Sequence, residues 1–382
     1  MNSQKWMSQN FFIYFFTWGI FLPYWTGWLA SGKGIGVAEA SLIMGFATIM
    51  RGMASMFIYP SFSKYWSQEK ILLGGTVLSL LISLMYIPAS TFFTLFFITV
   101  LFSAIYPTLL AAVESMASIL VQSDGIHYGR SRSYGSLGYI VAVFIISIVT
   151  VYFGDGAILY GMILGLAIFL CWRIVPSPAA IAHKPINQKQ NKKQTMLGLF
   201  KKSGFPIILL VVFLLQGAHA AYYNYGYLYL QKVNVADYWI GVLLNIAIIA
   251  EIIFLSIADR YFSSWRPSSL LLIAAIGSSV RWFLYLILDK WVFIFSQTLH
   301  SLSFSMAHYA FIRYLTLHLP AEQHANAQGL YSALAMSFST AILTFGSGFL
   351  YVIMPELAFI GMLVCTIPAI FIIIVMRRKY SF

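Results

Sequence analysis

FFTLFFITVLFSAIYPTLLAAVESMASIL, residues 92–120, carries a single charged side chain, Glu114, in a run long enough to cross a bilayer as a helix. The rest of the chain has the same character, because 60% of its 382 residues are hydrophobic and only 9% are charged. A soluble domain carries about 25% charged residues, since water must wet its surface. The runs are continuously apolar and lack the period-two alternation of membrane strands. The sequence therefore predicts an all-α membrane protein.

Similar apolar runs recur along the chain and predict twelve transmembrane helices. The expected spans are 8–30, 39–62, 70–90, 92–120, 132–153, 156–175, 205–231, 237–260, 267–288, 291–317, 324–350 and 356–376. An even number of spans places both termini on one side of the membrane. Only Lys33, Lys232 and Lys290 fall in loops on the opposite side, whereas the remaining loops and both tails are rich in Lys and Arg. The positive-inside rule therefore predicts a multi-pass protein with cytoplasmic termini.

The polar, basic segment 176–204 divides the spans into two sets of six. It predicts a cytoplasmic linker between an N-terminal bundle, residues 1–175, and a C-terminal bundle, residues 205–382. A short internal match supports two related halves. YPSFSKYW at 59–66 and LSIADRYF at 255–262 each end the second span of a half with a basic residue followed by an aromatic one. Two pseudo-symmetric six-helix bundles are expected, related as parallel repeats.

Ionisable side chains remain inside several of these spans, although each costs at least about 2.5 kcal/mol at the centre of a bilayer helix. They are Arg51, Glu114, Arg132, Glu251, Arg281 and Arg313, together with His219, His300 and His308. Glu114 and Glu251 are the only acids expected away from the membrane interfaces, and one lies in each half. Groups kept at this cost usually line a polar path, so the pattern favours a carrier of polar solutes.

Glu114 and Arg132 lie on consecutive spans, and antiparallel neighbouring helices can bring them together. A carboxylate beside a guanidinium offers a solute both an acceptor and a planar donor fork, which makes the two residues candidates for substrate binding. Alternatively, the pair only neutralises itself and serves structure. Tyr222 and Tyr223, in AAYYNYGYLYL, are further candidates. They would either stack on a ring-bearing substrate or belong to an interfacial belt.

Glu251, Arg281 and His300 are candidate proton-coupling residues. Glu251 lies midway along the eighth span, where a carboxyl group in apolar surroundings can hold a proton near neutral pH. His300 can relay protons because imidazole titrates near neutrality, and Arg281 can tune a nearby acid. Each of these groups could instead make a plain hydrogen bond between helices.

Other features predict structure rather than chemistry. Cys171 and Cys365 lie inside apolar runs and are expected to be buried, inert thiols. Small residues in GSLGYIVA, 135–142, are expected to let helices pack closely. The sequence contains no nucleotide-binding loop, metal-ligand spacing or nucleophile motif, so neither an enzyme nor a bound metal or cofactor is expected. The energy would come from an ion gradient, here expected to be a proton gradient, or from the substrate's own gradient. The expected partners are a small-molecule substrate, protons and the lipid bilayer, without nucleic acid, for a monomer.

These residues resemble the major facilitator superfamily of transporters along almost the whole chain, and within it the group of the 3-phenylpropionic acid transporter and, more distantly, lactose permease. The first span is similar to the family's opening pattern through Gly19, Pro23 and Trp28. The segment 113–139, VESMASILVQSDGIHYGRSRSYGSLGY, has the eighteen-residue spacing from acid to arginine that lactose permease has. LLQGAHAAYY, residues 214–223, looks like the phenylpropionate transporter in particular.

The resemblance implies that Glu114 and Arg132 bind substrate and that Arg281 and His300 belong to the proton-coupling region. It also implies transport by alternating access across a bacterial inner membrane. The expected function is proton-coupled import of a small organic solute, most simply an aromatic carboxylate such as 3-phenylpropionate. A proton-coupled sugar or nucleoside symporter is the alternative, and a membrane sensor that transports nothing is the alternative from another class.

Two positions depart from the family's sugar symporter. Ser303 stands where that protein has a carboxylate, and Gln297 stands where it has a lysine. The sugar-type proton relay therefore cannot be copied onto this chain. Glu251 is the expected substitute for the missing carboxylate.

Overall fold

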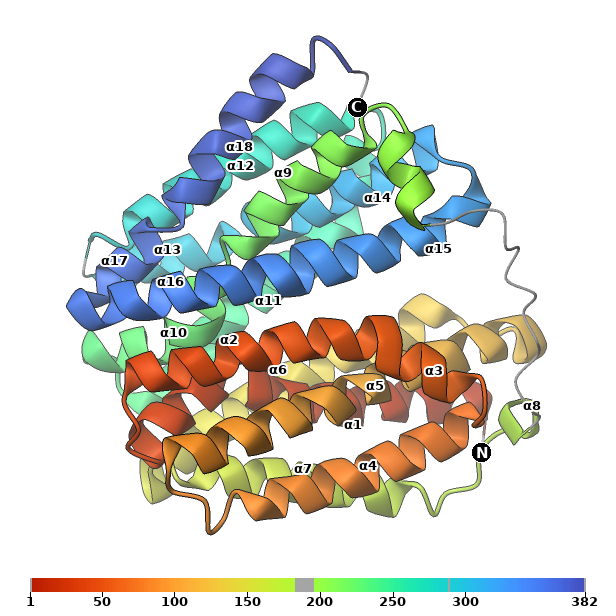
Figure 1. Cartoon of the computed structure of the whole chain (residues 1–382), viewed down its shortest axis with the longest axis vertical. Coiled ribbons are helices and arrows are strands. Elements are labelled where there is room, and N and C mark those ends of the chain that lie inside the picture. The colour runs from red at the N-terminus through yellow and green to blue at the C-terminus, as the bar shows by residue number, and fades with distance from the viewer. Residues whose placement is uncertain (1, 183–195, 288, 381–382) are drawn as a thin grey trace. The chain divides into compact units, whose positions relative to one another are not determined.

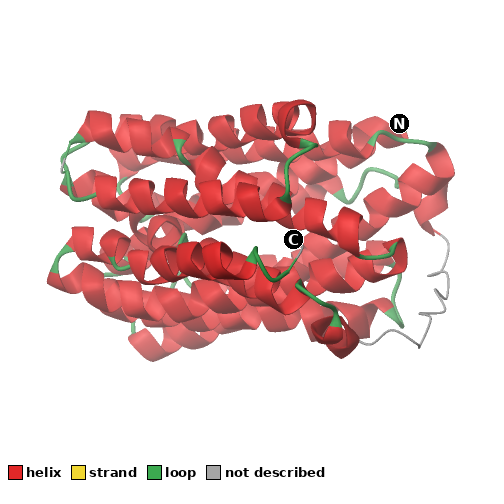
Figure 2. Cartoon of the chain, turned by 90° about the horizontal axis from the view of Figure 1, so that it is seen from above, coloured by secondary structure: helices red, strands yellow, loops and turns green. Residues whose placement is uncertain are grey.

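The computed structural model describes residues 2–182, 196–287 and 289–380, and all regular elements among them are helices (Figure 1). Colouring by secondary structure shows only helices and loops in these ranges (Figure 2). The predicted all-α fold is confirmed. Part of the predicted linker, residues 183–195, lies outside the described ranges.

The helices fall into two compact units, the first formed by Met1–Gln188 with Ala236–Val242 and the second by Lys189–Val235 with Leu243–Phe382. The first contains α1 (Ser3–Gly27), η1 (Trp28–Gly32), α2 (Val37–Met53), η2 (Ala54–Ile58), α3 (Tyr59–Ser63), α4 (Gln68–Met85), α5 (Phe92–Asp124), α6 (Tyr128–Phe153), α7 (Ala157–Trp172) and α8 (Ala179–Ala182). The second contains η3 (Met196–Lys201), α9 (Phe205–Gly217), α10 (Ala220–Lys232), most of α11 (Asp237–Phe262), α12 (Pro267–Leu284), α13 (Lys290–Thr298), η4 (Ser301–Ser305), α14 (Met306–His318), α15 (Ala321–Leu330), η5 (Tyr331–Phe338), α16 (Ser339–Ile353), α17 (Pro355–Ile360) and α18 (Leu363–Met376).

Nine helical stretches in the described ranges, several of them made of consecutive elements, are long and apolar enough to cross a membrane. The remaining predicted spans are also helical. They correspond to α1, to the shorter apolar helix α7 and to the rod formed by the consecutive elements α13, η4 and α14. Helix ends lie within a few residues of the predicted ones, as for α5 against 92–120 and α11 against 237–260. Helices thus occupy all twelve predicted spans.

Four of these rods contain a π-helical stretch, namely η1, η2, η4 and η5 among the described residues. A π turn closes its hydrogen bonds from residue i to i+5, so it inserts an extra residue into the α-helix and turns the side chains beyond it to another face. Such bulges are frequent at functional sites. The sequence did not predict these π-helical stretches, because an apolar run shows no change of pattern where one occurs.

The turn between α5 and α6 determines which residues of the two helices lie opposite one another. Gly125 ends α5 in the left-handed conformation, at φ 63°, where its N–H donates to Leu120 O. Gln4 on α1 then holds the turn: its side-chain oxygen accepts from His127 N at 2.7 Å, and its amide nitrogen donates to His127 O at 3.1 Å. Because this connection is short, α5 and α6 run antiparallel as neighbours, and Glu114 can face Arg132.

Helices α1 and α6 pack closely, as the small residues of 135–142 predicted. A methyl group added at Gly138 would lie 2.9 Å from the carbonyl carbon of Phe12 and closer still to its oxygen. A methyl group at Gly19 would lie 2.8 Å from Tyr139 O. Glycine is therefore needed on both sides of this interface, where backbone meets backbone.

The second unit has its own apolar core, in which Val211, Leu271, Phe311 and Ile373 are fully buried. These side chains come from α9, α12, α14 and α18, so the core ties together helices that are far apart in sequence. This apolar core leaves the polar side chains of the second unit only a few places to lie.

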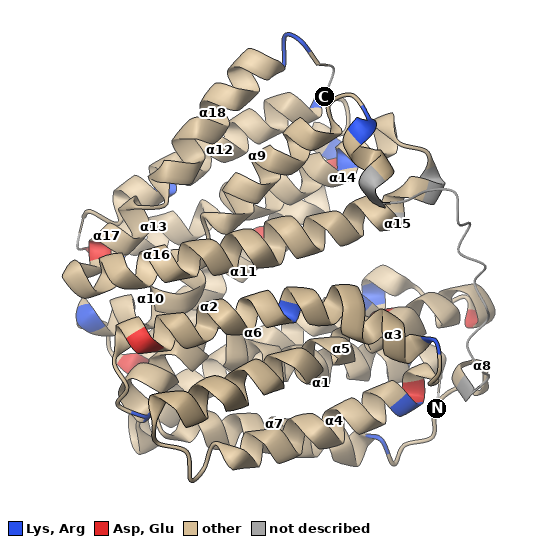
Figure 3. Ribbon diagram, viewed as in Figure 1, with Lys and Arg blue, Asp and Glu red and all other residues tan. Residues whose placement is uncertain are grey.

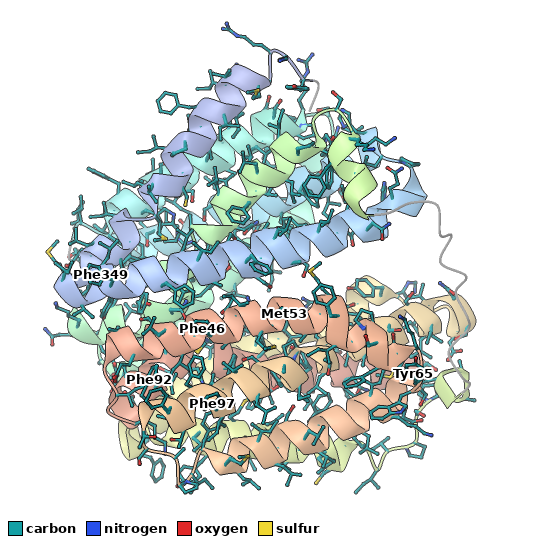
Figure 4. All side chains as sticks on the ribbon, in the orientation of Figure 1. Phe46, Met53, Tyr65, Phe92, Phe97 and Phe349 are labelled. Atoms are coloured by element: carbon teal, nitrogen blue, oxygen red, sulfur yellow. The ribbon has the colours of Figure 1, made fainter. Side chains whose placement is uncertain are left out.

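The outer faces of both units are apolar as well. Phe97 on α5 is 66% exposed and Phe349 on α16 is 70% exposed, and both are labelled in Figure 4. Charged residues sit mainly near helix ends, with long tan stretches between them (Figure 3). A surface of this kind suits hydrocarbon rather than water. The prediction of two buried thiols is half wrong: Cys365 is buried, whereas Cys171 lies on an exposed face of α7.

Candidate functional site

In the first unit, the structure brings Glu114 and Arg132 together. The Nε atom of Arg132 on α6 lies 3.5 Å from Oε1 of Glu114 on α5, and each side chain is 35% exposed. Tyr128, at the first turn of α6, donates its hydroxyl hydrogen to Oε2 of Glu114 at 2.9 Å. The tyrosine thus holds the carboxylate while the arginine lies beside it. The site is an ion pair on two helices joined by a tight turn.

Two phenylalanines of α1 cover the guanidinium of this pair. The Cζ atom of Arg132 lies 4.1 Å from the ring centre of Phe15 and 5.8 Å from that of Phe11. Phe11 also meets Tyr128 edge to face at 6.1 Å. A planar cation over an aromatic face is stabilised by the ring's quadrupole, and weakly hydrated guanidinium tolerates this position better than ammonium does.

The other intramembrane arginines contact different groups. Arg51 on α2 lies over the ring of Trp18, with its Cζ 5.4 Å from the ring centre. Arg313 on α14 donates from Nε to Trp265 O at 2.7 Å, near the ends of α11 and α14.

In the second unit, Arg281 on α12 is the centre of a buried polar cluster. Its side chain is 0% exposed. Its Nη1 atom donates to Nδ1 of His300 at 2.8 Å and to Oγ of Ser303 at 3.2 Å, and Nη2 donates to Oε1 of Gln297 at 3.5 Å. Tyr222 lies under the guanidinium, with 4.5 Å from Cζ to its ring centre. A buried cation of this kind must be compensated by neighbouring acceptors or by an acid.

The contact with Arg281 fixes the tautomer of His300. Arginine can only donate, so Nδ1 of His300 accepts and the ring proton sits on Nε2. That Nε2 atom lies 3.6 Å from Oε2 of Glu251 on α11. The imidazole, 2% exposed, therefore stands between the buried cation and a carboxyl group that is 25% exposed. The structure thus brings the three predicted proton-coupling residues into one series of side-chain contacts, which we call the chain Arg281–His300–Glu251.

Ser303 extends this cluster to His219. The Nδ1 atom of His219 faces Leu215 O at 3.0 Å, and a carbonyl can only accept, so Nδ1 carries the proton. Nε2 of His219 then accepts from the hydroxyl of Ser303 at 3.1 Å. Both histidines are thereby assigned as neutral. Ser303, read from sequence only as a missing carboxylate, is the link between Arg281 and His219.

The cluster forms where two helical rods are irregular. The seventh span is broken between α9 and α10, directly at His219, and the tenth span contains η4 directly after His300. Irregular helix at membrane depth persists where it is buried in protein or lines a cavity, and transporters commonly place binding sites on discontinuous helices.

Tyr222 and Tyr223 lie at the edge of the same cluster. The ring of Tyr222 is 5.8 Å from that of His300, and the ring of Tyr223 stacks on that of His219 at 6.0 Å. The two tyrosine rings are 5.8 Å apart. The structure thus groups both tyrosines with Arg281 rather than with an outer aromatic belt.

One acid is buried at a helix start. Glu356, which lies in the stretch Met-Pro-Glu and is expected near an interface, is 5% exposed in the first turn of α17. It interacts electrostatically with Tyr229 and Tyr351. The proline at the helix start is the sequence signal that could have placed Glu356 on a helix N-terminus, where a carboxylate is stabilised.

Comparisons with known proteins agree with this architecture. The family model described as "MFS_1 like family" matches residues 5–360. The probable 3-phenylpropionic acid transporter of Escherichia coli (strain K12) is 28% identical over 376 residues, 97% of each chain. Maltose permease of Geobacillus stearothermophilus is 25% identical over 382 residues, which cover 97% of this chain and 93% of that one.

Solved structures show the same fold at lower sequence identity. The nucleoside transporter NupG has a TM-score of 0.83 at 15% identity, with 99% of both chains covered. The peptide transporter POT in complex with sulfate has a TM-score of 0.77 at 14% identity, with 99% of this chain and 94% of that chain covered. These relatives are transporters and not enzymes. The chain belongs to the MFS_1-like family and is a multi-pass secondary transporter of the major facilitator type, with a small-molecule substrate.

Proposed function

We propose that this transporter imports a small aromatic carboxylate, such as 3-phenylpropionate, together with protons. It would work by alternating access, as a monomer in a bacterial inner membrane with both termini in the cytoplasm. The relative that covers 97% of this chain at 28% identity is named a probable 3-phenylpropionic acid transporter, which supports the substrate class. The basic loops support the orientation.

The observation that carries proton coupling is the chain Arg281–His300–Glu251, with 2.8 Å from arginine to imidazole and 3.6 Å from imidazole to carboxyl. Glu251 in its charged form faces the Nε2–H of a neutral imidazole whose other nitrogen is polarised by a buried cation. When Glu251 is protonated, this attraction is lost, and the carboxyl group is no longer held to the cluster of Arg281 and His300. A proton on this carboxyl therefore changes the electrostatics of α11, α12 and α14 together.

The carboxylate of the substrate would bind Arg132. A second carboxylate competes with Glu114 for the same guanidinium, and Tyr128 can hold Glu114 when the arginine is shared. Phe15 and Phe11 give the arginine an aromatic surround that suits a ring-bearing acid. On the other unit, we assign Tyr222 and Tyr223 to contacts with a substrate ring, because their own rings lie beside a cation and two imidazoles.

The test uses purified protein in proteoliposomes, with labelled 3-phenylpropionate, maltose and uridine in parallel. An inward proton gradient should drive accumulation of 3-phenylpropionate, and adding substrate to de-energised vesicles should make the medium more alkaline. Accumulation of maltose or uridine alone would replace the proposed substrate by a sugar or a nucleoside, consistent with the maltose permease relative. Clear uptake without any pH change would reject proton coupling.

Glu251→Gln isolates the coupling residue. The amide keeps the shape but holds no exchangeable carboxyl proton, so gradient-driven accumulation should be lost while exchange of internal for external substrate continues. Glu39→Gln is the matched control, because Glu39 is exposed in the first turn of α2. Unimpaired accumulation by the Glu251→Gln protein would remove this carboxyl from the coupling.

A further inference from the structure

One face of α1 carries three aromatic residues, and two arginines from other helices lie over it. Phe11, Phe15 and Trp18 follow the spacing i, i+4, i+7 in a regular α-helix, so their side chains share one face, which we call the α1 stripe. The Cζ atom of Arg132 on α6 lies 5.8 Å from the ring centre of Phe11 and 4.1 Å from that of Phe15. The Cζ atom of Arg51 on α2 lies 5.4 Å from the ring centre of Trp18. Two guanidinium groups therefore border the same stripe.

Trp18 is fixed by its packing against α5. Its ring stacks on that of Tyr106, with 6.2 Å between the ring centres and 18° between the planes. The hydroxyl oxygen of Tyr106 in turn lies 2.7 Å from Oγ1 of Thr17, and both of these side chains are buried. A ring locked in this way gives Arg51 a defined resting place, and a selective binding group needs such rigid support.

The depth of Arg51 in the membrane indicates what it faces. It lies near the middle of the span Val37–Ser63, and its side chain is half-buried. A cation at this depth is costly against hydrocarbon, so it is kept where it faces the bundle interior or a water-filled path. Arg132 and Glu114, each 35% exposed, are under the same constraint. Because Arg51 and Arg132 also share the α1 stripe, we place the three charged groups on one polar surface of the first unit.

The spacing along α1 sets the length of a ligand that could reach both arginines. Trp18 lies about 4.5 Å along the helix axis from Phe15 and about 10.5 Å from Phe11. A phenyl ring with a two-carbon acid chain falls between these lengths, so a carboxylate bound at Arg132 brings the far edge of the ring toward Arg51. Two arginines and one carboxylate leave a single positive charge on this surface, which one substrate carboxylate balances. A neutral hydrogen-bond acceptor therefore suits the far edge better than a second acid.

We propose that Arg51 selects the substrate by donating a hydrogen bond to a hydroxyl group on the ring, at the end remote from the carboxylate. The inference rests on the proposed import of an aromatic carboxylate and narrows that class to hydroxyaryl acids, for example 3-(4-hydroxyphenyl)propionate. A phenol oxygen accepts hydrogen bonds, and a guanidinium has five N–H donors, so Arg51 can bind the ligand and keep contacts within the protein. Arg132 holds the carboxylate, and Arg51 recognises the ring substituent.

The test measures KM in proteoliposomes for 3-(4-hydroxyphenyl)propionate, 3-(4-methylphenyl)propionate and 3-phenylpropionate. The methyl group fills the same space as the hydroxyl but accepts no hydrogen bond. In the wild type, KM for the hydroxy acid should be about tenfold below that for the methyl acid, the effect of one hydrogen bond to a charged group. Arg51→Met keeps an unbranched side chain over Trp18 and removes every donor, so the ratio of these two KM values should fall to about one. Loss of folded protein lowers uptake of all three acids alike and leaves this ratio unchanged.

Two other arginines serve as controls. Arg132→Met removes the proposed partner of the carboxylate, so KM should rise for all three acids together, unlike the selective effect of Arg51→Met. Arg130→Met, at an exposed position of α6, should keep the wild-type KM for each acid.

The possible outcomes keep the two proposals apart. Failure of the wild type to take up any of the three acids would overturn the proposed function. Uptake of all three with equal KM, or a preference for the hydroxy acid that Arg51→Met retains, would overturn the role of Arg51 alone. If Arg51→Met did not fold, Arg51→Gln would decide, because the amide keeps a donor but loses the charge. A ratio below the wild-type value in that variant supports the inference, and an unchanged ratio refutes it.

Discussion

Gly138→Ala is the sharpest test of how α1 and α6 position Arg132. The new methyl group would lie 2.9 Å from the carbonyl carbon and 3.1 Å from the Cα atom of Phe12. Carbon atoms in contact prefer about 3.5–4.0 Å, so the two helices would have to separate by about 0.6 Å or more. Backbone atoms cannot rotate away as side chains can, and the strain must therefore be taken by the helix interface.

Overpacking a well-packed site costs about 1–3 kcal/mol, and a clash with backbone belongs at the upper end, about 3 kcal/mol. Each kcal/mol corresponds to about 2 °C in Tm for a chain of this size, so Tm should fall by about 6 °C. The separation would also pull Arg132 on α6 away from Phe15 on α1, which are now 4.1 Å apart. Substrate affinity should fall together with stability.

The assay is thermal unfolding of the purified protein in detergent at a fixed scan rate, followed by substrate binding at a temperature where both variants are folded. Gly74→Ala is the control, because nothing lies within 4 Å of a methyl group at Gly74 in α4. Alanine favours helix over glycine by about 0.8–1.0 kcal/mol, so this variant should melt at the wild-type temperature or slightly above it. A Gly138→Ala protein as stable as Gly74→Ala, with unchanged affinity, would refute the close packing of α1 on α6.

Three further substitutions test other contacts. Arg132→Lys should raise KM for a carboxylate substrate about 10–100-fold, since ammonium cannot replace a planar donor fork. Arg130→Lys, at an exposed position of α6, should leave KM unchanged. Equal effects of the two substitutions would refute the assignment of Arg132 to the substrate carboxylate. Lys33→Met removes donors to Tyr86 O at 2.7 Å, Ile87 O at 3.2 Å and Ala89 O at 2.7 Å, and should cost about 2 kcal/mol, seen as a lower Tm with unchanged KM. Ser303→Ala should slow coupled uptake about tenfold, because it removes one acceptor of Arg281 and the hydroxyl donor to Nε2 of His219. Ser301→Ala in the same η4 segment should be neutral, and wild-type uptake by Ser303→Ala would contradict the hydrogen-bond order.

The sequence predicted the spans well because apolar length is a strong signal with few competing explanations. Residues 92–120 became α5, which begins after the Thr91 capping box and ends at Gly125, signals that lie outside the apolar run itself. The pairing of Glu114 with Arg132 followed from two consecutive spans and a short turn. Neither inference required knowledge of how distant helices pack.

The second cluster was only partly predictable. Arg281, His300 and Glu251 were singled out one by one as costly residues, but their order in space depends on the packing of α11, α12 and α14. The π-helical stretch η4 turns the residues that follow it to another face, and an apolar run gives no sign of it. The burial of Glu356 is likewise a product of the tertiary fold, because other elements cover a short polar stretch that the sequence places near an interface.

The hydrogen bond from Arg281 to His300 bears on the charge balance of the transport cycle. Because that bond keeps the imidazole neutral, Glu251 is the group in the chain Arg281–His300–Glu251 that can store a proton between binding and release. A cycle that carries one stored proton and one monocarboxylate moves no net charge. Uptake of 3-phenylpropionate should then follow the pH gradient and ignore a potassium diffusion potential set with valinomycin. Uptake of an uncharged sugar by the same machinery would be electrogenic, so an electrical measurement alone can tell the two substrate classes apart.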